Sequence, residues 1–117
     1  MADLAALDQD LNQLVAQGKA LDAFEKYYAE DVVMQENTDE PRRGRAACRE
    51  AEAEFFASVE KVHRLTFTRS AVGDGVTFTE WELDITFKSG QRMQQSQVSR
   101  RLWKNGQVVD ERFYYKQ

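Results

Sequence analysis

The spacing of apolar residues changes between the two halves of this chain, and that change limits the fold more than any other feature. In the first half, Leu4, Leu7, Leu11 and Leu14 recur every three or four residues, which is typical of an amphipathic helix. From Val62 to Tyr115 the pattern favours strands separated by turn signals. Helices followed by a run of strands predict an α+β domain.

Three helices are expected before the strands begin. The first has Asp3 as its N-cap and Gly18 as its stop signal. A second, shorter helix ends near Tyr28, and a third spans about Arg45 to Val59. The helical spacing in the third predicts a buried stripe made of Cys48, Ala51, Phe55 and Val59.

Glycine-containing breaks divide the second half into four long antiparallel strands. The breaks are Gly73-Asp74-Gly75, Ser89-Gly90 and Asn105-Gly106. The Asn-Gly pair is the strongest signal, because both central residues of such a hairpin turn need positive φ. A short strand from Val32 to Gln35 completes the expected sheet. The sequence thus predicts one domain over residues 1–117, with three helices packed on a curved, mostly antiparallel sheet.

The expected turn lengths predict which side chains share a face of the sheet. Two-residue turns at the second and third breaks, with a three-residue turn at the first, place one apolar face toward the helices. In this register Arg100 faces Glu111 across the last hairpin, while Ser96 and Tyr115 fall on the same face. The apolar members are Leu65, Phe67, Trp81, Leu83, Ile85, Val98, Leu102, Val109 and Phe113.

Charge and composition exclude several classes of function. The net charge is -4 and the pI is near 5.0, which is the opposite of the basic footprint of a nucleic-acid binder. A single cysteine, Cys48, and a single histidine, His63, do not form a zinc site of the usual Cys/His type. The N-terminus does not look like a signal peptide, and no apolar run is long enough to span a membrane. The expectation is a cytoplasmic protein without a membrane or nucleic-acid partner.

The order of elements and three segments resemble the nuclear transport factor 2-like superfamily, and its SnoaL-like group in particular. The segments are Y-A-E-D-V-V-M-Q-E-N from Tyr28, R-R-G-R-A-A from Arg42, and R-L-W-K-N-G-Q-V-V-D-E-R-F-Y-Y from Arg101. The resemblance implies a cone in which a bent sheet wraps the helices and leaves a pocket at its wide end. It also implies homodimers through the outer face of the sheet. Members include polyketide cyclases, ketosteroid isomerases, epoxide hydrolases and dehydratases.

Comparison with the ketosteroid isomerases gives a candidate for the catalytic residue. Their general-base aspartate follows a Y-A-D-D segment, and the corresponding position here is Glu36. A glutamate in an apolar cone would have a raised pKa and could move a proton next to a carbonyl. The family's oxyanion tyrosine falls near Leu11 or Asn12, and its protonated aspartate at Val98 or Ser99. Without those donors the enolate lacks its main stabilisation, so isomerase activity is not predicted.

Other residues are candidates for ligand contacts, and each has a structural alternative. Glu36 can be a solvated loop carboxylate, Arg100 and Glu111 a structural ion pair, and the aromatic residues part of the core. Polar groups on an apolar concave wall are what small-molecule pockets use for orientation. The candidate ligand-binding residues are Tyr28, Trp81, Ser96, Arg100, Glu111, Phe113 and Tyr115.

Two functions remain open from the sequence. The first is a protein that binds a small, mostly apolar molecule in the cone and carries out proton transfer, cyclisation or hydrolysis without metal or cofactor. The second is a non-catalytic homodimeric module whose cone is filled by its own aromatic side chains, among them Phe67 and Phe87. A weaker third reading is a protein-partner domain that uses the face with Trp103 and Tyr114.

Overall fold

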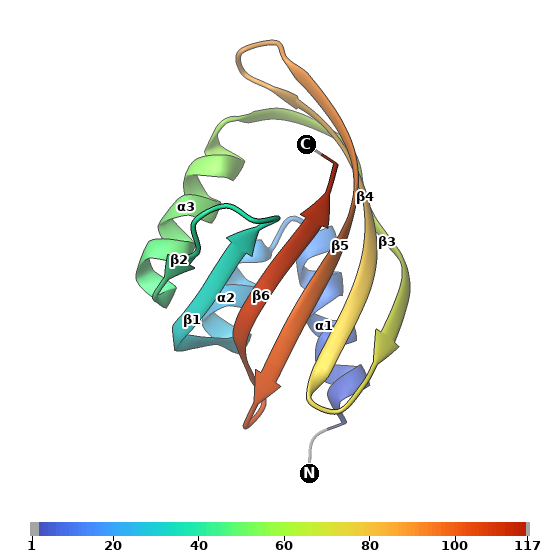
Figure 1. Ribbon diagram of the computed structural model, residues 1–117. Helices are drawn as coiled ribbons and strands as arrows, with labels where there is room; N and C mark the ends of the chain where they lie inside the picture. Colours follow the sequence, from blue (N-terminus) through green and yellow to red (C-terminus); the bar gives the residue numbers. More distant parts are fainter. Residues whose placement is uncertain (1–2, 117) are drawn as a thin grey trace.

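The computed structural model describes residues 3–116 and shows three helices on one side of a six-stranded sheet (Figure 1). This confirms the predicted α+β architecture, with one short strand more than expected. The helices are α1 (Leu4–Ala16), α2 (Ala20–Tyr27) and α3 (Arg45–Ala57). The strands are β1 (Tyr28–Glu36), β2 (Arg42–Arg43), β3 (Val59–Val72), β4 (Val76–Phe87), β5 (Arg92–Lys104) and β6 (Gln107–Tyr115).

The helix boundaries follow the local signals. Asp3 caps α1, since its Oδ1 accepts a hydrogen bond from Ala5 N at 3.0 Å. Gly18 adopts a φ of 79° after the helix ends, a conformation that glycine reaches without steric cost. α3 ends at Ala57, two residues before the predicted Val59, which instead begins β3. No helix within residues 3–116 is long and apolar enough to cross a membrane.

The sheet has the order β2-β1-β6-β5-β4-β3 and is antiparallel except where β1 pairs with β6. The four long strands β3 to β6 curve, and the concave side faces α1 and α2 (Figure 1). α3 lies beyond the β1 edge, where it packs against β1 and β2 (Figure 1). The helices therefore cover the concave side of the sheet and the end of the sheet formed by β1 and β2.

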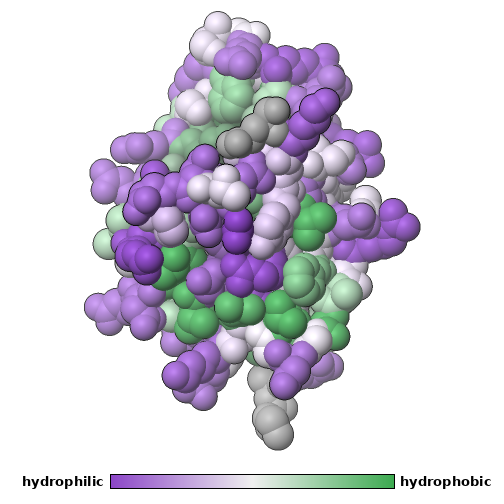
Figure 2. Space-filling model, in the orientation of Figure 1, coloured by the Kyte–Doolittle hydropathy of each residue, from purple (hydrophilic) through white to green (hydrophobic). Residues whose placement is uncertain are grey.

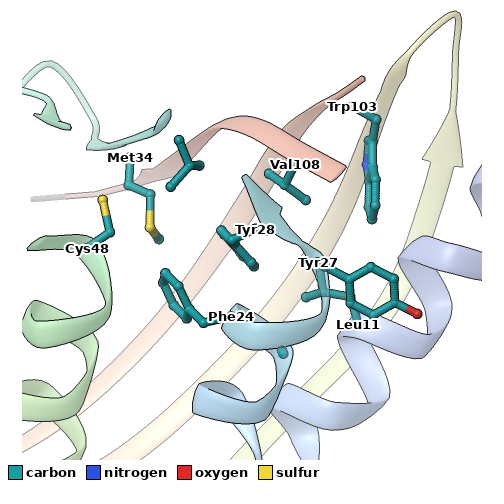
Figure 3. Close-up of a cluster of buried hydrophobic side chains, with 10 residues drawn as sticks. Leu11, Phe24, Tyr27, Tyr28, Met34, Cys48, Trp103 and Val108 are labelled. Carbon is teal, nitrogen blue, oxygen red and sulfur yellow. The ribbon is translucent and has the colours of Figure 1, made fainter. Parts of the chain in front are cut away.

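The core fills the part of this space between α1, α2 and the β1–β6 pair. Leu11, Val32 and Val108 are completely buried there. Phe24 stacks on Tyr28 with ring centroids 4.3 Å apart, and Figure 3 shows both rings beside Met34 and Cys48.

For two of the three predicted turns, the flanking strands contain the residue pairs that the sequence predicts. Lys104 pairs with Gln107 around Asn105-Gly106, whose φ angles are 53° and 76°. Phe67 pairs with Trp81 across β3 and β4 as predicted, although beside the turn Val72 pairs with Thr77 and an irregularity between Phe67 and Ser70 restores the register. The prediction for Ser89-Gly90 is wrong. The connection there spans residues 88–91, and Trp81 pairs with Gln97 instead of Val98.

A bulge in the last hairpin causes a second error in the predicted register. Trp103 pairs with Val108, but Leu102 pairs with Asp110, so that β6 holds one extra residue. Beyond the bulge, Glu111 pairs with Arg101, and the predicted partner Arg100 pairs with Arg112. The combined result is that alternate residues of β5, including Gln95, Gln97 and Arg101, face the helices in place of Ser96, Val98 and Arg100.

Candidate functional site

A cavity of about 520 Å³ opens between the helices and the concave side of the sheet. Its lining comes from all three helices and all six strands described above. Most of its walls are apolar, and besides two tyrosines the aromatic side chains in them are Phe24, Phe55, Phe56, Trp81 and Phe113. Its main polar lining comes from Tyr28, Glu36, Glu52, Arg101, Glu111 and Tyr115. The buried side chains of Tyr28, Arg101 and Glu111 form what we call the floor.

Arg101 is the centre of a buried polar network behind the floor. Its Nε donates to Glu111 Oε2 at 2.7 Å, and its Nη1 donates to Asp8 Oδ1 at 2.8 Å. Nη1 also donates to Asn12 Oδ1 at 2.6 Å. All four of these side chains are at most 3% exposed. Because a buried charge is tolerated when it is paired and hydrogen-bonded, the network fixes the guanidinium in one position.

The network extends from Asp8 on α1 to β4, where side chains of β4 donate hydrogen bonds to the Asp8 carboxylate. Asp8 Oδ1 accepts from Thr77 Oγ1 at 2.8 Å, and Thr77 Oγ1 in turn accepts from Trp103 Nε1 at 2.9 Å. Asn12 Nδ2 donates to Thr79 Oγ1 at 3.1 Å. These contacts join the first helix to β4 and, through Thr77 and Trp103, to β5, and they explain why polar residues occupy buried positions in α1.

Tyr28 and Glu111 form the second polar contact of the floor. The Tyr28 hydroxyl donates to Glu111 Oε1 at 2.5 Å. Burial, followed by the negative charge of Glu111, raises the pKa of Tyr28 well above its ordinary value. Tyr28 therefore stays protonated, and both oxygens of Glu111 are occupied, one by Tyr28 and one by Arg101.

One end of the Arg101 guanidinium has no internal partner. Its Nε and Nη1 atoms donate to the carboxylates and to Asn12, whereas no hydrogen bond from Nη2 is found within residues 3–116. Arg101 lines the cavity although its side chain is only 3% exposed. A guanidinium has five N–H donors, so these side chains do not use every donor of Arg101.

Glu52 on α3 supplies a carboxyl group to the opposite wall. It lines the cavity and is partly buried, and no hydrogen bond or ion pair to it is found within residues 3–116. Burial raises the pKa of Glu52 to about 7, and the negative charges of Glu111 and Glu36 add to this effect. At neutral pH this carboxyl group is present in both its protonated and its ionised form.

Glu36 and Tyr115 lie nearer to solvent. Glu36 ends β1 and lines the cavity, but its side chain is exposed. Burial still raises the pKa of Glu36, while a hydrogen bond from Tyr115 opposes that rise. Partial burial, with the charge of Glu36, raises the pKa of Tyr115 to about 12. Glu36, together with the exposed Arg42 and Glu54, therefore forms the mouth of the cavity.

The structure brings together most of the candidate residues named from the sequence. Glu36 and five of the seven candidate ligand contacts line one cavity, namely Tyr28, Trp81, Glu111, Phe113 and Tyr115. The remaining two do not. Ser96 donates to Glu82 Oε2 at 2.7 Å, and Arg100 donates to Asp110 Oδ1 at 2.8 Å. The prediction that these two face the helices is wrong, because the β4–β5 connection and the β5–β6 bulge each shift the register by one residue.

Two important residues of the cavity were not identified from the sequence. The predicted register puts Arg100 on the inner face, and the alternation of a strand then puts its neighbour Arg101 on the outer one. Glu52 lies four residues after Cys48 and four before Phe56, and this helical spacing would have placed it on the inward side of α3. Within residues 3–116, no group of three or more His, Cys, Asp or Glu side chains is arranged to hold a metal ion.

Helices covering a strongly curved sheet, with a cavity open at one end, define the nuclear transport factor 2-like class of protein. The family model for the SnoaL-like domain matches residues 4–115. The chain therefore belongs to the SnoaL-like family. No curated protein matches its sequence.

Solved structures share this fold over nearly the whole chain. A provisionally named SnoaL-like polyketide cyclase from Mesorhizobium loti has 27% sequence identity and a TM-score of 0.85, covering 97% of this chain and 100% of that one. Another from Jannaschia sp. has 14% identity and a TM-score of 0.81, covering 96% and 84%. A hypothetical protein with a ketosteroid isomerase-like fold from Catenulispora acidiphila, solved in complex with trimethylamine, has 16% identity and a TM-score of 0.76, covering 92% and 83%.

Proposed function

We propose that this protein binds a small, mostly apolar molecule in its cavity and exchanges a proton with it through Glu52. One observation carries the proposal: a carboxyl group without an internal partner lies on the wall of an aromatic cavity, and its pKa is about 7. A general acid or base is most effective when its pKa is near the working pH. Glu52 meets that condition at neutral pH.

The size and lining of the cavity support the binding step. A volume of about 520 Å³ falls within the range of small-molecule sites, which extends from about 300 to 1,000 Å³. Trp81 and Phe113 would provide apolar contact area, while Tyr28, Glu111 and Tyr115 would orient a polar group of the ligand. The Mesorhizobium loti relative is provisionally named a polyketide cyclase. Cyclisation, proton transfer and hydrolysis are therefore the reaction classes that we assign to the cavity.

Glu36 is the second candidate for the proton carrier. It also lines the cavity and its pKa is raised, but its side chain is exposed at the mouth. A solvated carboxylate has a pKa nearer its ordinary value and is a weaker base. We therefore expect Glu36 to contribute less than Glu52.

Binding can be tested with the neutral dye Nile red, whose fluorescence increases in apolar surroundings. Ala51 lines the cavity from α3, so Ala51→Phe should fill part of the space and abolish the fluorescence increase. Ala47→Phe places the same ring on the exposed side of the same helix and should leave the increase unchanged. Equal dye binding by both variants would show that the dye does not occupy this cavity.

Proton transfer can be tested by the uptake of solvent deuterium into a panel of small aromatic ketones, esters and nitroalkanes, followed by NMR. Glu52→Gln should remove exchange catalysed by the protein, and Glu36→Gln should reduce it less. Glu50→Gln makes the same change on an exposed position of α3 and serves as the control. If exchange persists in Glu52→Gln, a residue other than Glu52 carries the proton.

A homodimer through the outer face of the sheet is a second part of the proposal. Phe78 on β4 and Tyr114 on β6 are each 40% exposed, and register places both on the face that turns away from α1 and α2. Figure 2 shows apolar and polar side chains interspersed on this face. Such a mixture is usual for protein interfaces. Sedimentation equilibrium at micromolar concentration should give a dimer, and Phe78→Glu should give a monomer. A monomeric wild-type protein would contradict this part.

A further inference from the structure

We propose that the cavity takes an organic cation, an alkylammonium group carried on an apolar body, and that the carboxylates of Glu52 and Glu36 are its counter-ions. This inference rests on the proposed function, because it names the class of molecule that the same cavity binds. It is carried by the charges of the lining and by the aromatic rings that lie beside these two carboxylates.

The charged side chains of the lining give the cavity a negative balance. The lining contains four glutamates and two arginines. One of the arginines, Arg101, is already paired with Glu111 and with Asp8. The other, Arg42, is exposed at the mouth, and no hydrogen bond or ion pair from its side chain is found within residues 3–116. A cavity lined by an excess of one sign of charge concentrates ligands of the opposite sign, which here are cations.

Glu36 and Glu52 lie where the aromatic cavity meets a smaller, polar space. This second space has a volume of about 150 Å³. The two spaces share six lining residues, among them both glutamates and Phe113. The smaller space adds two more carboxylates, Asp39 and Glu40, which are exposed to solvent. A ligand with an apolar body in the larger space would therefore present a cationic end to carboxylates at the boundary.

Aromatic rings lie next to both carboxylates. Phe55 and Phe56 follow Glu52 by three and four residues on α3, so the three side chains are neighbours on the helix surface. Phe113 pairs with Glu36 between β6 and β1. All three phenylalanines line the cavity. A cation held by the carboxylates would thus have aromatic rings within reach, and the faces of such rings attract an ammonium group most strongly where water is excluded.

The environment of Glu52 favours a cation over an anion or a neutral group. Burial raises the pKa of Glu52 to about 7, and the negative charges of Glu111 and Glu36 add to this effect, because the ionised form lacks a compensating partner. The desolvation of this carboxylate is already included in the folded state, so a ligand cation would gain the ion pair without that part of the penalty. A ligand carboxylate would meet like charges, and a neutral ligand would leave Glu52 unpaired.

Two probes of the same shape test the charge of the ligand: benzyltrimethylammonium and neopentylbenzene, in which a carbon atom replaces the nitrogen. Displacement of bound Nile red by each probe gives its affinity. At pH 8 the cation should bind more tightly by about tenfold, a difference of roughly 1.4 kcal/mol. The anion tert-butylbenzoate should bind more weakly than the cation. Equal or tighter binding of either the neutral probe or the anion would overturn the inference.

The affinity for the cation should depend on pH through Glu52. Benzyltrimethylammonium keeps its charge at every pH, whereas Glu52 ionises around its pKa of about 7. The affinity for the cation should therefore rise about tenfold from pH 6 to pH 8, and the affinity for neopentylbenzene should not. Burial raises the pKa values of Tyr28 and Tyr115, so both stay neutral in this interval. The charged groups that face Glu52 from other elements are Glu111 on β6, Glu36 on β1 and Arg42 on β2, with Arg101 on β5 beside Glu111.

A set of variants separates the counter-ions from the binding function itself. Glu52→Gln should remove most of the preference for the cation together with its pH dependence, and Glu36→Gln should reduce the preference less. Glu50→Gln, on the exposed side of α3, should keep both. Nile red binding by Glu52→Gln checks that its cavity is intact, and the wild-type probe pair and pH series decide the question if this variant does not fold.

The outcomes distinguish this assignment from the proposed function. If Nile red occupies the wild-type cavity but the cation is not preferred, the cavity binds apolar molecules and the assignment of a cation is wrong. A preference that is unchanged in Glu52→Gln, or that does not change between pH 6 and pH 8, would contradict Glu52 as the counter-ion. If Nile red does not bind in the cavity, both the assignment and the proposed function are contradicted.

Discussion

Arg101 on β5 and Glu111 on β6 form a buried ion pair, with 2.7 Å between Nε and Oε2 and side chains that are 3% and 1% exposed. The pair holds together two strands at the floor of the cavity, and Asp8 joins it from the first helix at 2.8 Å. Arg101 and Glu111 are thus deeply buried charges that also line the cavity. The Arg101–Glu111 ion pair therefore contributes to the stability of the fold and makes the floor of the cavity polar.

Replacement of Arg101 by an apolar side chain should be strongly destabilising. Arg101→Met leaves Asp8 and Glu111 buried without their cation, and breaking such a pair lowers the free energy of unfolding by about 3 to 5 kcal/mol. Arg100→Met removes a more exposed pair with Asp110 and should lower it by about 1 kcal/mol or less. Urea unfolding of both variants measures the difference. Similar losses in the two would mean that the buried network contributes no more than a surface pair.

Removal of the Tyr28 hydroxyl should also reduce stability. Tyr28→Phe deletes a buried hydrogen bond of 2.5 Å to the Glu111 carboxylate, and bonds to charged groups contribute about 1.5 to 3 kcal/mol. Tyr27→Phe is the matched control, because the Tyr27 hydroxyl bonds to Asp10, which is partly exposed. The free energy of unfolding should fall more for Tyr28→Phe. A larger fall for Tyr27→Phe would contradict the buried position of the Tyr28–Glu111 hydrogen bond.

Stability should depend on pH through Glu52. Its pKa is about 7 in the folded protein, above the ordinary 4.5, so between these values the native state holds a proton that the unfolded state has lost. Stability therefore falls as pH rises through this interval. Glu52→Gln removes the effect and should be more stable than wild type above about pH 8, by up to roughly 3 kcal/mol.

At about pH 4, where the wild-type carboxyl group is protonated in both states, Glu52→Gln should be close to wild type in stability. Urea unfolding at several pH values measures this, and Glu50→Gln should follow the wild-type curve. A Glu52→Gln curve parallel to wild type throughout would show that the pKa of Glu52 is not raised.

The turn between β5 and β6 should not accept a β-branched residue. Asn105 has a φ of 53°, and this left-handed conformation is strained for bulky residues by about 1 to 3 kcal/mol. Asn105→Val should lower the melting temperature by several degrees for a domain of this size. Asp74→Val, at a turn residue without positive φ, should have a smaller effect. Equal shifts would indicate that the strain is not at Asn105.

The local sequence determined the elements of this protein. Asp3 and Gly18 mark the ends of the first helix, and Asn105-Gly106 marks the last hairpin, because capping and positive φ depend on a few adjacent residues. The alternating residues of β3, β4 and β6 predicted which side chains face inward, so that Trp81, Phe113 and Glu111 were placed on the correct side. The resemblance to SnoaL-like proteins predicted the curved sheet that the structure shows.

Tertiary structure decided which polar residue of β5 reaches the cavity. Local sequence does not specify the one-residue shifts at the β4–β5 connection and the β5–β6 bulge, which depend on how whole strands pair. The shift at the β4–β5 connection turns Arg101 inward in place of Arg100, and the β5–β6 bulge keeps Glu111 on that same side. The pKa of Glu52 is likewise a tertiary property, because it arises from burial and from charges that lie on other strands. The sequence thus determined the elements and the fold. The pairing of whole strands decided that Arg101 and Glu111, and not Arg100, lie together at the cavity.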